Sequence, residues 1–222
     1  STTMTPAAEL TPQENTRYQE LDSRPLHGFS NTDLADYLRL RTRLLGDIPE
    51  RPTPADEIGL FARKGLGQAY RLNASRFDLA ESDCVVFCER NIAMSLATDW
   101  DSYYVLCERL RHKDGVVNYK NRHFTTLGDW LSGQGWLLRD ITPELGPEST
   151  RSAQTFTHVV RPKVFEEIPA APGSRFKRIV FKGSDYRSPD AKTLTETYIP
   201  RDRIPDVLGD LRTGDVALVL RP

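Results

Sequence analysis

Gly67-Gln68-Ala69-Tyr70 and Asp83-Cys84-Val85-Val86-Phe87 are the two segments that decide how this chain folds. The run over positions 84–97 is mostly apolar and lacks Gly and Pro, which predicts a helix with Ser82 or Asp83 as its N-cap. The cysteine then lies in the first turn, where free backbone N–H groups and the positive end of the helix dipole favour the thiolate. A cysteine at a helix start is also commonly a small buried hydrophobe. The two segments alone therefore leave a catalytic and a packing role open.

The bulk composition predicts one sizeable globular domain. The chain has 222 residues, of which 38% are hydrophobic and 27% charged, and its net charge is -1. A nearly neutral chain gives no electrostatic reason to expect binding to nucleic acid or to an anionic membrane surface. No run approaches the roughly 18 apolar residues of a membrane span, and the first 13 residues lack the pattern of a signal peptide.

Helical spacing dominates the first two thirds of the chain. Residues 1–30 are polar with little periodicity, which predicts an N-terminal arm, and residues 31–222 are predicted to form the domain itself. Ser30 or Asn31 and Thr53 are the candidate N-caps of the first two helices, and Gly65 is a candidate stop. The predicted helices cover residues 31–45, 53–64, 84–97, 101–111 and 126–131.

Beyond Pro147 the pattern changes to shorter β-rich runs. These predict strands over residues 155–161, 175–182, 194–199 and 216–220, with turns at 169–173, 183–189 and Gly214-Asp215. Helices first and an antiparallel sheet second indicate an α+β fold rather than alternating βαβ units.

Three motifs in this order carry a family resemblance. The nucleophile segment reads Asp83-Cys84-Val85-Val86-Phe87-Cys88-Glu89, a later segment reads Arg122-His123-Phe124 followed by Asp129-Trp130, and the last is Gly214-Asp215-Val216-Ala217-Leu218. Together with the Gly-x-x-Tyr segment they resemble the NlpC-type, papain-like cell-wall hydrolases of bacteria. The chain is most similar to their N-acetylmuramoyl-L-alanine amidase-like branch, from about Ile58 to residue 222.

The resemblance implies a papain-like cysteine hydrolase acting on bacterial peptidoglycan or its muropeptide fragments. The bond cut is then the amide between N-acetylmuramic acid and L-Ala. Cys84 attacks the carbonyl carbon while N–H groups at the helix start hold the oxyanion. This chemistry needs no metal and no organic cofactor. Such a substrate implies a periplasmic or secreted protein.

Two other functions stay open beside this one. An endopeptidase uses the same chemistry on the bond between γ-D-Glu and the diamino acid. A non-catalytic domain that binds muropeptides or a protein partner keeps the cleft but lacks the histidine base.

The resemblance also implies a histidine that this sequence does not place. In the family the imidazole that faces the thiol lies on a strand after the Gly-Asp strand. None of His27, His112, His123 and His158 follows Gly214. We therefore expect the catalytic histidine, and with it the last part of the sheet, to lie beyond residue 222; the alternative is that the protein has lost it.

Several residues are candidates for contact with the substrate. Tyr70 either lines the cleft beside the nucleophile or packs in the core. Arg122, with His123 beside it, lies in a loop and either grips a peptide carboxylate in bidentate fashion or is solvated. Trp130 either stacks on a sugar or covers the core. Asp83 precedes the nucleophile and completes the predicted set.

The other residues with reactive or charged side chains are predicted to have structural roles. Glu89 lies in an apolar helix, so it needs a partner if buried, and Arg122 is a candidate. Cys88 has no second pair of residues at metal-ligand spacing, so it and Cys107 are predicted to pack in the core. His158 alternates with apolar residues and is predicted to be a strand histidine.

Overall fold

A computed structural model gives the structure of the protein. It describes residues 9–46, 48, 50–72, 74–117, 121–123, 126–146, 149–169 and 177–220, and for 127 and 152–192 it describes the backbone alone. The chain divides into two units. The first comprises Ser1–Cys107 with Glu167–Ile179, and the second Glu108–Glu166 with Val180–Pro222.

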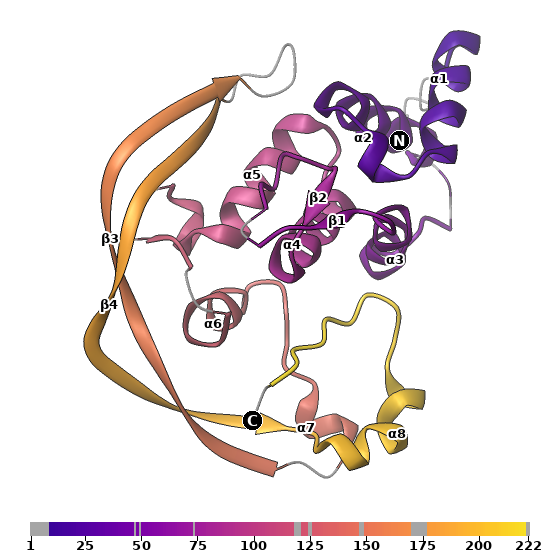
Figure 1. Ribbon diagram of the computed structural model, residues 1–222. Helices are drawn as coiled ribbons and strands as arrows, with labels where there is room; N and C mark the ends of the chain where they lie inside the picture. The colour runs from indigo at the N-terminus through magenta and orange to yellow at the C-terminus, as the bar shows by residue number, and fades with distance from the viewer. Residues whose placement is uncertain are drawn as a thin grey trace, which may run out of the picture. The chain divides into compact units, whose positions relative to one another are not determined.

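The first unit is mainly helical (Figure 1). Helix α1 packs against α2, and α3 packs against α4. The helices predicted at 31–45, 53–64, 84–97 and 101–111 are confirmed within a residue or two at each end. The observed bounds are α1 Pro12–Ser23, the 3-10 turn η1 Leu26–Gly28, α2 Asn31–Leu45, α3 Pro54–Lys64, α4 Cys84–Leu96 and α5 Trp100–Arg111.

The first three helices all begin with the same capping box. In each one the N-cap hydroxyl accepts from the N–H group three residues on, and the carboxylate there accepts from the N-cap N–H. The pairs are Thr11 with Glu14, Ser30 with Asp33 and Thr53 with Asp56. The second and third N-caps, Ser30 and Thr53, are those that the sequence predicts.

These hydrogen bonds lower the pKa of the three capping carboxylates. For Glu14 the backbone N–H of Thr11 is the main cause of the lowered pKa, and for Asp56 the side chain and backbone of Thr53 are. Burial acts to raise the pKa of Asp33, but hydrogen bonds from Ser30 and Arg17 outweigh it. All three carboxylates therefore stabilise the folded state in their ionised form.

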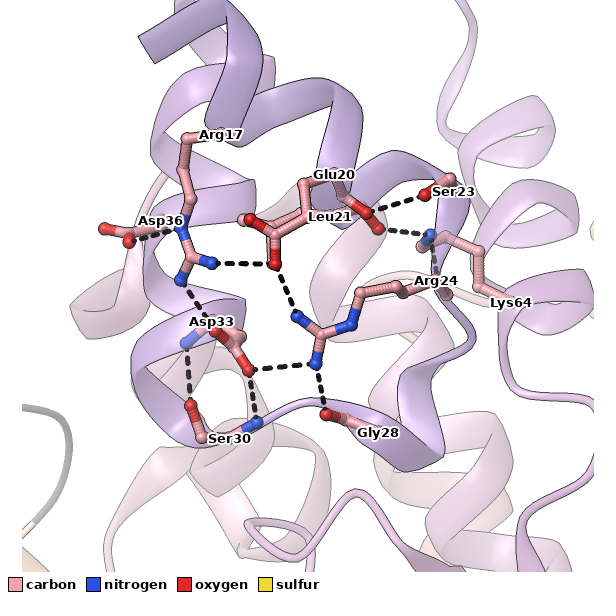
Figure 2. Close-up of polar contacts among 10 residues, drawn as sticks. All are labelled: Arg17, Glu20, Leu21, Ser23, Arg24, Gly28, Ser30, Asp33, Asp36 and Lys64. Atoms are coloured by element: carbon pink, nitrogen blue, oxygen red, sulfur yellow. Dashed lines mark hydrogen bonds and ion pairs between the residues drawn. The ribbon is translucent and has the colours of Figure 1, made fainter. Parts of the chain in front are cut away.

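The segment expected to be an arm contains helix α1, which the sequence analysis did not predict. Two of its side chains, Tyr18 and Leu21, are buried. Arg17 on α1 reaches two carboxylates of α2, donating to Asp33 at 2.6 Å and to Asp36 at 3.2 Å (Figure 2). Packing and ion pairs to α2 thus hold a helix whose own sequence is polar.

Lys64, the last residue of α3, closes the carboxyl-terminal end of α1. Its ammonium group donates to the carbonyl oxygens of Leu21 (3.0 Å), Asp22 (2.8 Å) and Arg24 (2.7 Å). It also lies 4.9 Å from the centre of the Tyr37 ring, a cation–π distance. Burial lowers the pKa of Lys64. The carbonyl groups that a helix end leaves without partners are satisfied here by a side chain 40 or more residues away.

Two short strands lie between α3 and α4. β1 (Ala69–Tyr70) pairs with β2 (Glu81–Ser82) in parallel, with Tyr70 opposite Ser82. The loop that joins them packs on α5: Phe77 stacks on Tyr104, and the Tyr103 hydroxyl donates to the Arg76 carbonyl oxygen at 2.6 Å. The segment that leads into α4 is therefore held in two ways, by the pairing of β2 with β1 and by the packing of their joining loop on α5.

The later β-rich region forms two long strands instead of several short ones. β3 (Ser149–Pro169) and β4 (Lys177–Tyr198) pair with each other as a two-stranded ribbon (Figure 1). β4 continues through 183–189, so the turn predicted there is wrong, and most of the turn predicted at 169–173 lies outside the described residues. With helices and two small sheets, the architecture is compatible with the predicted α+β class.

The strand predicted at 216–220 is wrong. Gly214-Asp215 does form a turn, in which the Asp215 N–H donates to the Arg212 carbonyl oxygen at 3.1 Å. In the residues described after it, the chain pairs with no strand, and Val219 is 84% exposed. An apolar run needs a neighbouring strand to satisfy its backbone groups.

The second unit also contains several short helical segments. The helix predicted at 126–131 is found as a π-helix, η4 Thr126–Trp130, continued by α6 Leu131–Gly133. Among the described residues no helix is both long and apolar enough to cross a bilayer. The other segments are η2 Lys113–Gly115, α7 Thr142–Leu145, η5 Arg201–Arg203, α8 Ile204–Val207 and η6 Leu208–Asp210.

Candidate functional site

Cys84 occupies the first position of α4, and its side chain is exposed. Of the two predicted N-caps, Asp83 is the one found: its backbone is extended, and its carboxylate accepts from the Val86 N–H at 2.8 Å. In the described part of the chain no acceptor faces the N–H groups of Cys84 and Val85. The exposed thiol therefore lies beside two free backbone donors.

Tyr70 lies on β1, which pairs with β2, and β2 leads into α4. It faces Ser82 in the β1–β2 pair, and the Arg71 N–H donates to the Ser82 carbonyl oxygen at 3.0 Å. The Tyr70 side chain is 73% exposed, so it is not a core aromatic. Tyr70, Asp83 and Cys84 all belong to the first unit.

Arg90 supports this arrangement, and sequence analysis missed it. The residue is only 2% exposed, and its guanidinium donates to the carbonyl oxygens of Asp78, at 2.7 Å, and of Glu81. Burial lowers the pKa of Arg90. An arginine in a mostly apolar helix was the available signal, because such a charge must have acceptors if it is buried. Here it fixes β2, which leads directly into Asp83.

The side chains of Phe87 and His27 lie against glycines in or near the Gly67–Tyr70 segment. A methyl group on Gly65 would lie 3.0 Å from the ring of Phe87, which is on the first turn of α4. A methyl group on Gly67 would lie 3.3 Å from the imidazole of His27. His27, from the turn after α1, thus packs on the Gly67–Tyr70 segment, a placement that the sequence did not indicate.

The other two cysteines differ from Cys84. Cys107 is buried, as predicted, and Cys88 is half-buried. Burial raises the pKa of Cys88 to about 11. Across the described residues no group of three His, Cys, Asp or Glu side chains is arranged to hold a metal ion.

The remaining candidates lie in the second unit. Arg122 forms an antiparallel bridge with His112, and the His123 N–H donates to the Arg111 carbonyl oxygen at 2.8 Å, so the segment is attached to the end of α5. Trp130 is only 5% exposed, as its packing alternative requires. Phe124 and the side chain of His158 lie outside the described residues.

Two further titratable side chains are buried. Glu89 is fully buried in α4. His112 is also buried, and its imidazole pairs with the Glu108 carboxylate at 3.0 Å, one helical turn earlier. His112 is thus engaged in the second unit.

Comparison with known proteins gives one match. No curated protein and no solved structure matches the chain. A family model, described as AmiA-like, N-acetylmuramoyl-L-alanine amidase-like, matches residues 62–222. That range contains Tyr70, Asp83, Cys84 and the Arg122-His123 segment and excludes α1 and α2. Because the match covers well over half of its length, the chain belongs to the AmiA-like family of N-acetylmuramoyl-L-alanine amidase-like proteins.

Proposed function

We propose that this protein is a papain-like, NlpC-type cysteine amidase that cleaves the bond between N-acetylmuramic acid and L-Ala in peptidoglycan or muropeptides. Family membership supports an amide hydrolase that acts on cell-wall peptidoglycan. The choice of nucleophile depends on one observation, the exposed thiol of Cys84 at the first position of α4. With this substrate the protein acts in the periplasm or outside the cell.

The proposed reaction has two steps. The Cys84 thiol gives its proton to an imidazole, and the thiolate attacks the lactyl carbonyl carbon. The C–N bond then breaks as the imidazolium gives that proton to the departing L-Ala nitrogen. Water then hydrolyses the thioester, which restores the thiol and leaves a free lactyl carboxylate. The N–H groups of Cys84 and Val85 are suited to hold the oxyanion, because each acts as a preorganised backbone donor.

Three other side chains bind the substrate in this proposal. Tyr70 offers an exposed aromatic face beside the strand that leads to the nucleophile. Arg122 pairs with a peptide carboxylate such as that of D-Glu, since a guanidinium binds carboxylates in bidentate fashion. His123, next to it, donates a hydrogen bond to the same peptide. Asp83 supports the nucleophile as the N-cap of α4, and Trp130 is buried in the second unit.

The test is a digest of purified muropeptides by the complete gene product, analysed by mass spectrometry. We expect free peptides that begin with L-Ala, and we expect Cys84→Ala to abolish them. Cys88→Ala is the matched control, because it removes a thiol one turn further along the same helix and should retain cleavage. Far-ultraviolet circular dichroism checks that both variants fold.

Three other outcomes contradict the proposal in different ways. Release of an L-Ala-D-Glu dipeptide would place the cut at the γ-D-Glu bond. Equal binding of muropeptides by the wild type and Cys84→Ala, with no cleavage by either, would indicate a binding domain. Cleavage that survives Cys84→Ala would remove the nucleophile assignment.

A further inference from the structure

Two turns of the second unit are attached to adjacent carbonyl groups at the end of α5. The Leu110 carbonyl oxygen accepts from the Gln134 side-chain amide at 2.8 Å. The Arg111 carbonyl oxygen accepts from the backbone N–H of His123, also at 2.8 Å. The last carbonyl groups of a helix have no partner within the helix, so they can hold other segments. Here they hold the His123 segment and the Gln134 turn side by side.

Gln134 organises its turn as well as attaching it. Its side chain is fully buried, and its backbone carbonyl oxygen accepts from the N–H groups of Leu137 and Leu138 at 2.9 and 2.8 Å. Its side-chain oxygen accepts from the Trp136 indole at 3.2 Å. A buried amide satisfied in this way fixes the position of the residues on either side of it.

The imidazole of His123 lies directly against Gly133, the neighbour of Gln134. A methyl group on Gly133 would lie 2.5 Å from Cε1 and 2.6 Å from Nε2 of that ring. Neither distance is possible between unbonded atoms, so a side chain at this position must displace the imidazole.

Position 133 requires glycine because there is no room for a side chain, and not because of its backbone conformation. Gly133 is not among the residues with positive φ, so its backbone conformation is open to alanine. Gly135 provides a close comparison: its φ is also not positive, and a methyl group there would meet only the Ser132 carbonyl oxygen, at 3.9 Å. Of these two glycines, only Gly133 is at a position where a methyl group would meet the His123 ring.

We infer that Gly133 is a positioning residue, whose missing side chain leaves the place that the His123 imidazole occupies in substrate binding. This inference rests on the proposed function for the contribution of His123 to activity. The contacts at the end of α5 place the His123 backbone, and the ring lies against Gly133.

The test compares Gly133→Ala with Gly135→Ala in the whole protein. NMR reports on the His123 ring through its Cε1–H resonance and pH titration, assigned with His123→Gln. We expect Gly133→Ala to shift the resonance and its titration and to lower kcat/KM for muropeptide cleavage at least tenfold. Gly135→Ala should leave both unchanged.

A double variant keeps the test decisive if Gly133→Ala is too unstable to assay. The clash requires the imidazole, so Gly133→Ala should lower Tm in the wild-type background and have little effect on Tm in a His123→Ala background. An equal loss in both backgrounds, or an unchanged His123 resonance, would overturn the inference.

The outcomes also separate this inference from the proposed function. A shifted resonance with unchanged kcat/KM would overturn the role of His123 in substrate binding. If the complete wild-type gene product cleaves no muropeptide, the proposed function fails. The placement of the ring by Gly133 is then decided by the resonance and the double variant alone.

Discussion

Tyr70 is paired with Ser82 across the parallel β1–β2 sheet, which places its exposed ring on the strand next to the approach to Cys84. A pair of only two residues per strand makes few hydrogen bonds of its own. Its position is secured from outside, by the buried Arg90 guanidinium and by the loop packed on α5. The geometry near the thiol thus depends on groups that take no part in the proposed chemistry.

The three thiols should differ in their rates of alkylation. A limiting amount of iodoacetamide at pH 7 should modify Cys84 first, because its side chain is exposed while Cys107 is buried. Burial raises the pKa of Cys88 to about 11, so very little of it is thiolate at this pH. Peptide mapping by mass spectrometry measures the order. Labelling of Cys107 before Cys84 would contradict the assignment.

Removal of the Arg90 guanidinium should destabilise the first unit. Arg90→Met leaves two carbonyl groups without their donor, with an expected loss of about 2–4 kcal/mol in the free energy of unfolding. Arg71→Met is the control, because Arg71 makes an exposed ion pair with Glu81 whose loss should cost less than about 1 kcal/mol. Urea denaturation measures both. Equal losses would show that the buried contacts of Arg90 stabilise the protein no more than the exposed ion pair of Arg71 does.

Lys64→Met should separate the end of α1 from α3. The substitution keeps most of the apolar stem but removes the donor to Leu21, Asp22 and Arg24, and we expect a loss of about 2–4 kcal/mol. Lys113→Met, at an exposed lysine, should have little effect. Hydrogen exchange measured by mass spectrometry should show faster exchange in residues 12–23 only in the first variant. Unchanged exchange there would contradict the capping role.

The capping boxes predict a loss of stability in acid. Their three carboxylates have a lower pKa in the folded state than in the unfolded state. The unfolded state therefore binds more protons, so their contribution is complete above about pH 4 to 5 and is lost as pH falls through the folded-state pKa values.

A variant with all three carboxylates replaced tests this pH dependence. Its free energy of unfolding should be lower at pH 7 and fall less steeply between pH 5 and 3 than that of the wild type. The substitutions are Glu14→Gln, Asp33→Asn and Asp56→Asn. Glu50→Gln, at an exposed loop carboxylate, serves as the control. Parallel curves for the wild type and the triple variant would show that the caps do not set the acid sensitivity.

The sequence predicted those helices that begin with a cap residue and continue with apolar residues at helical spacing. Ser30, Thr53 and Asp83 are cap residues followed by apolar periodicity, and each begins the helix expected of it. Helix α1 also has a capping box, but its polar sequence lacks the apolar stripe of a packing helix. It is held by Lys64, which lies more than 40 residues beyond Leu21 and leaves no local trace in the sequence.

The strands and the supporting residues of the site were harder to predict for the same reason. Pairing of β3 with β4 is a non-local choice, so alternation alone could not show that β4 continues through 183–189. The helix start at Cys84 was predictable because it belongs to a short motif. Gly133 and Gln134 were not, since the contacts that matter come from α5 and from His123.

The contacts of Lys64 also bear on where this protein can be cut. The family match begins at residue 62, two positions before Lys64, whereas its three carbonyl acceptors all precede that boundary. A fragment trimmed to the family boundary would lose every acceptor of the Lys64 ammonium group, together with the aromatic ring of Tyr37. The evolutionary unit and the folding unit of this protein therefore have different amino-terminal limits, and expression should follow the second.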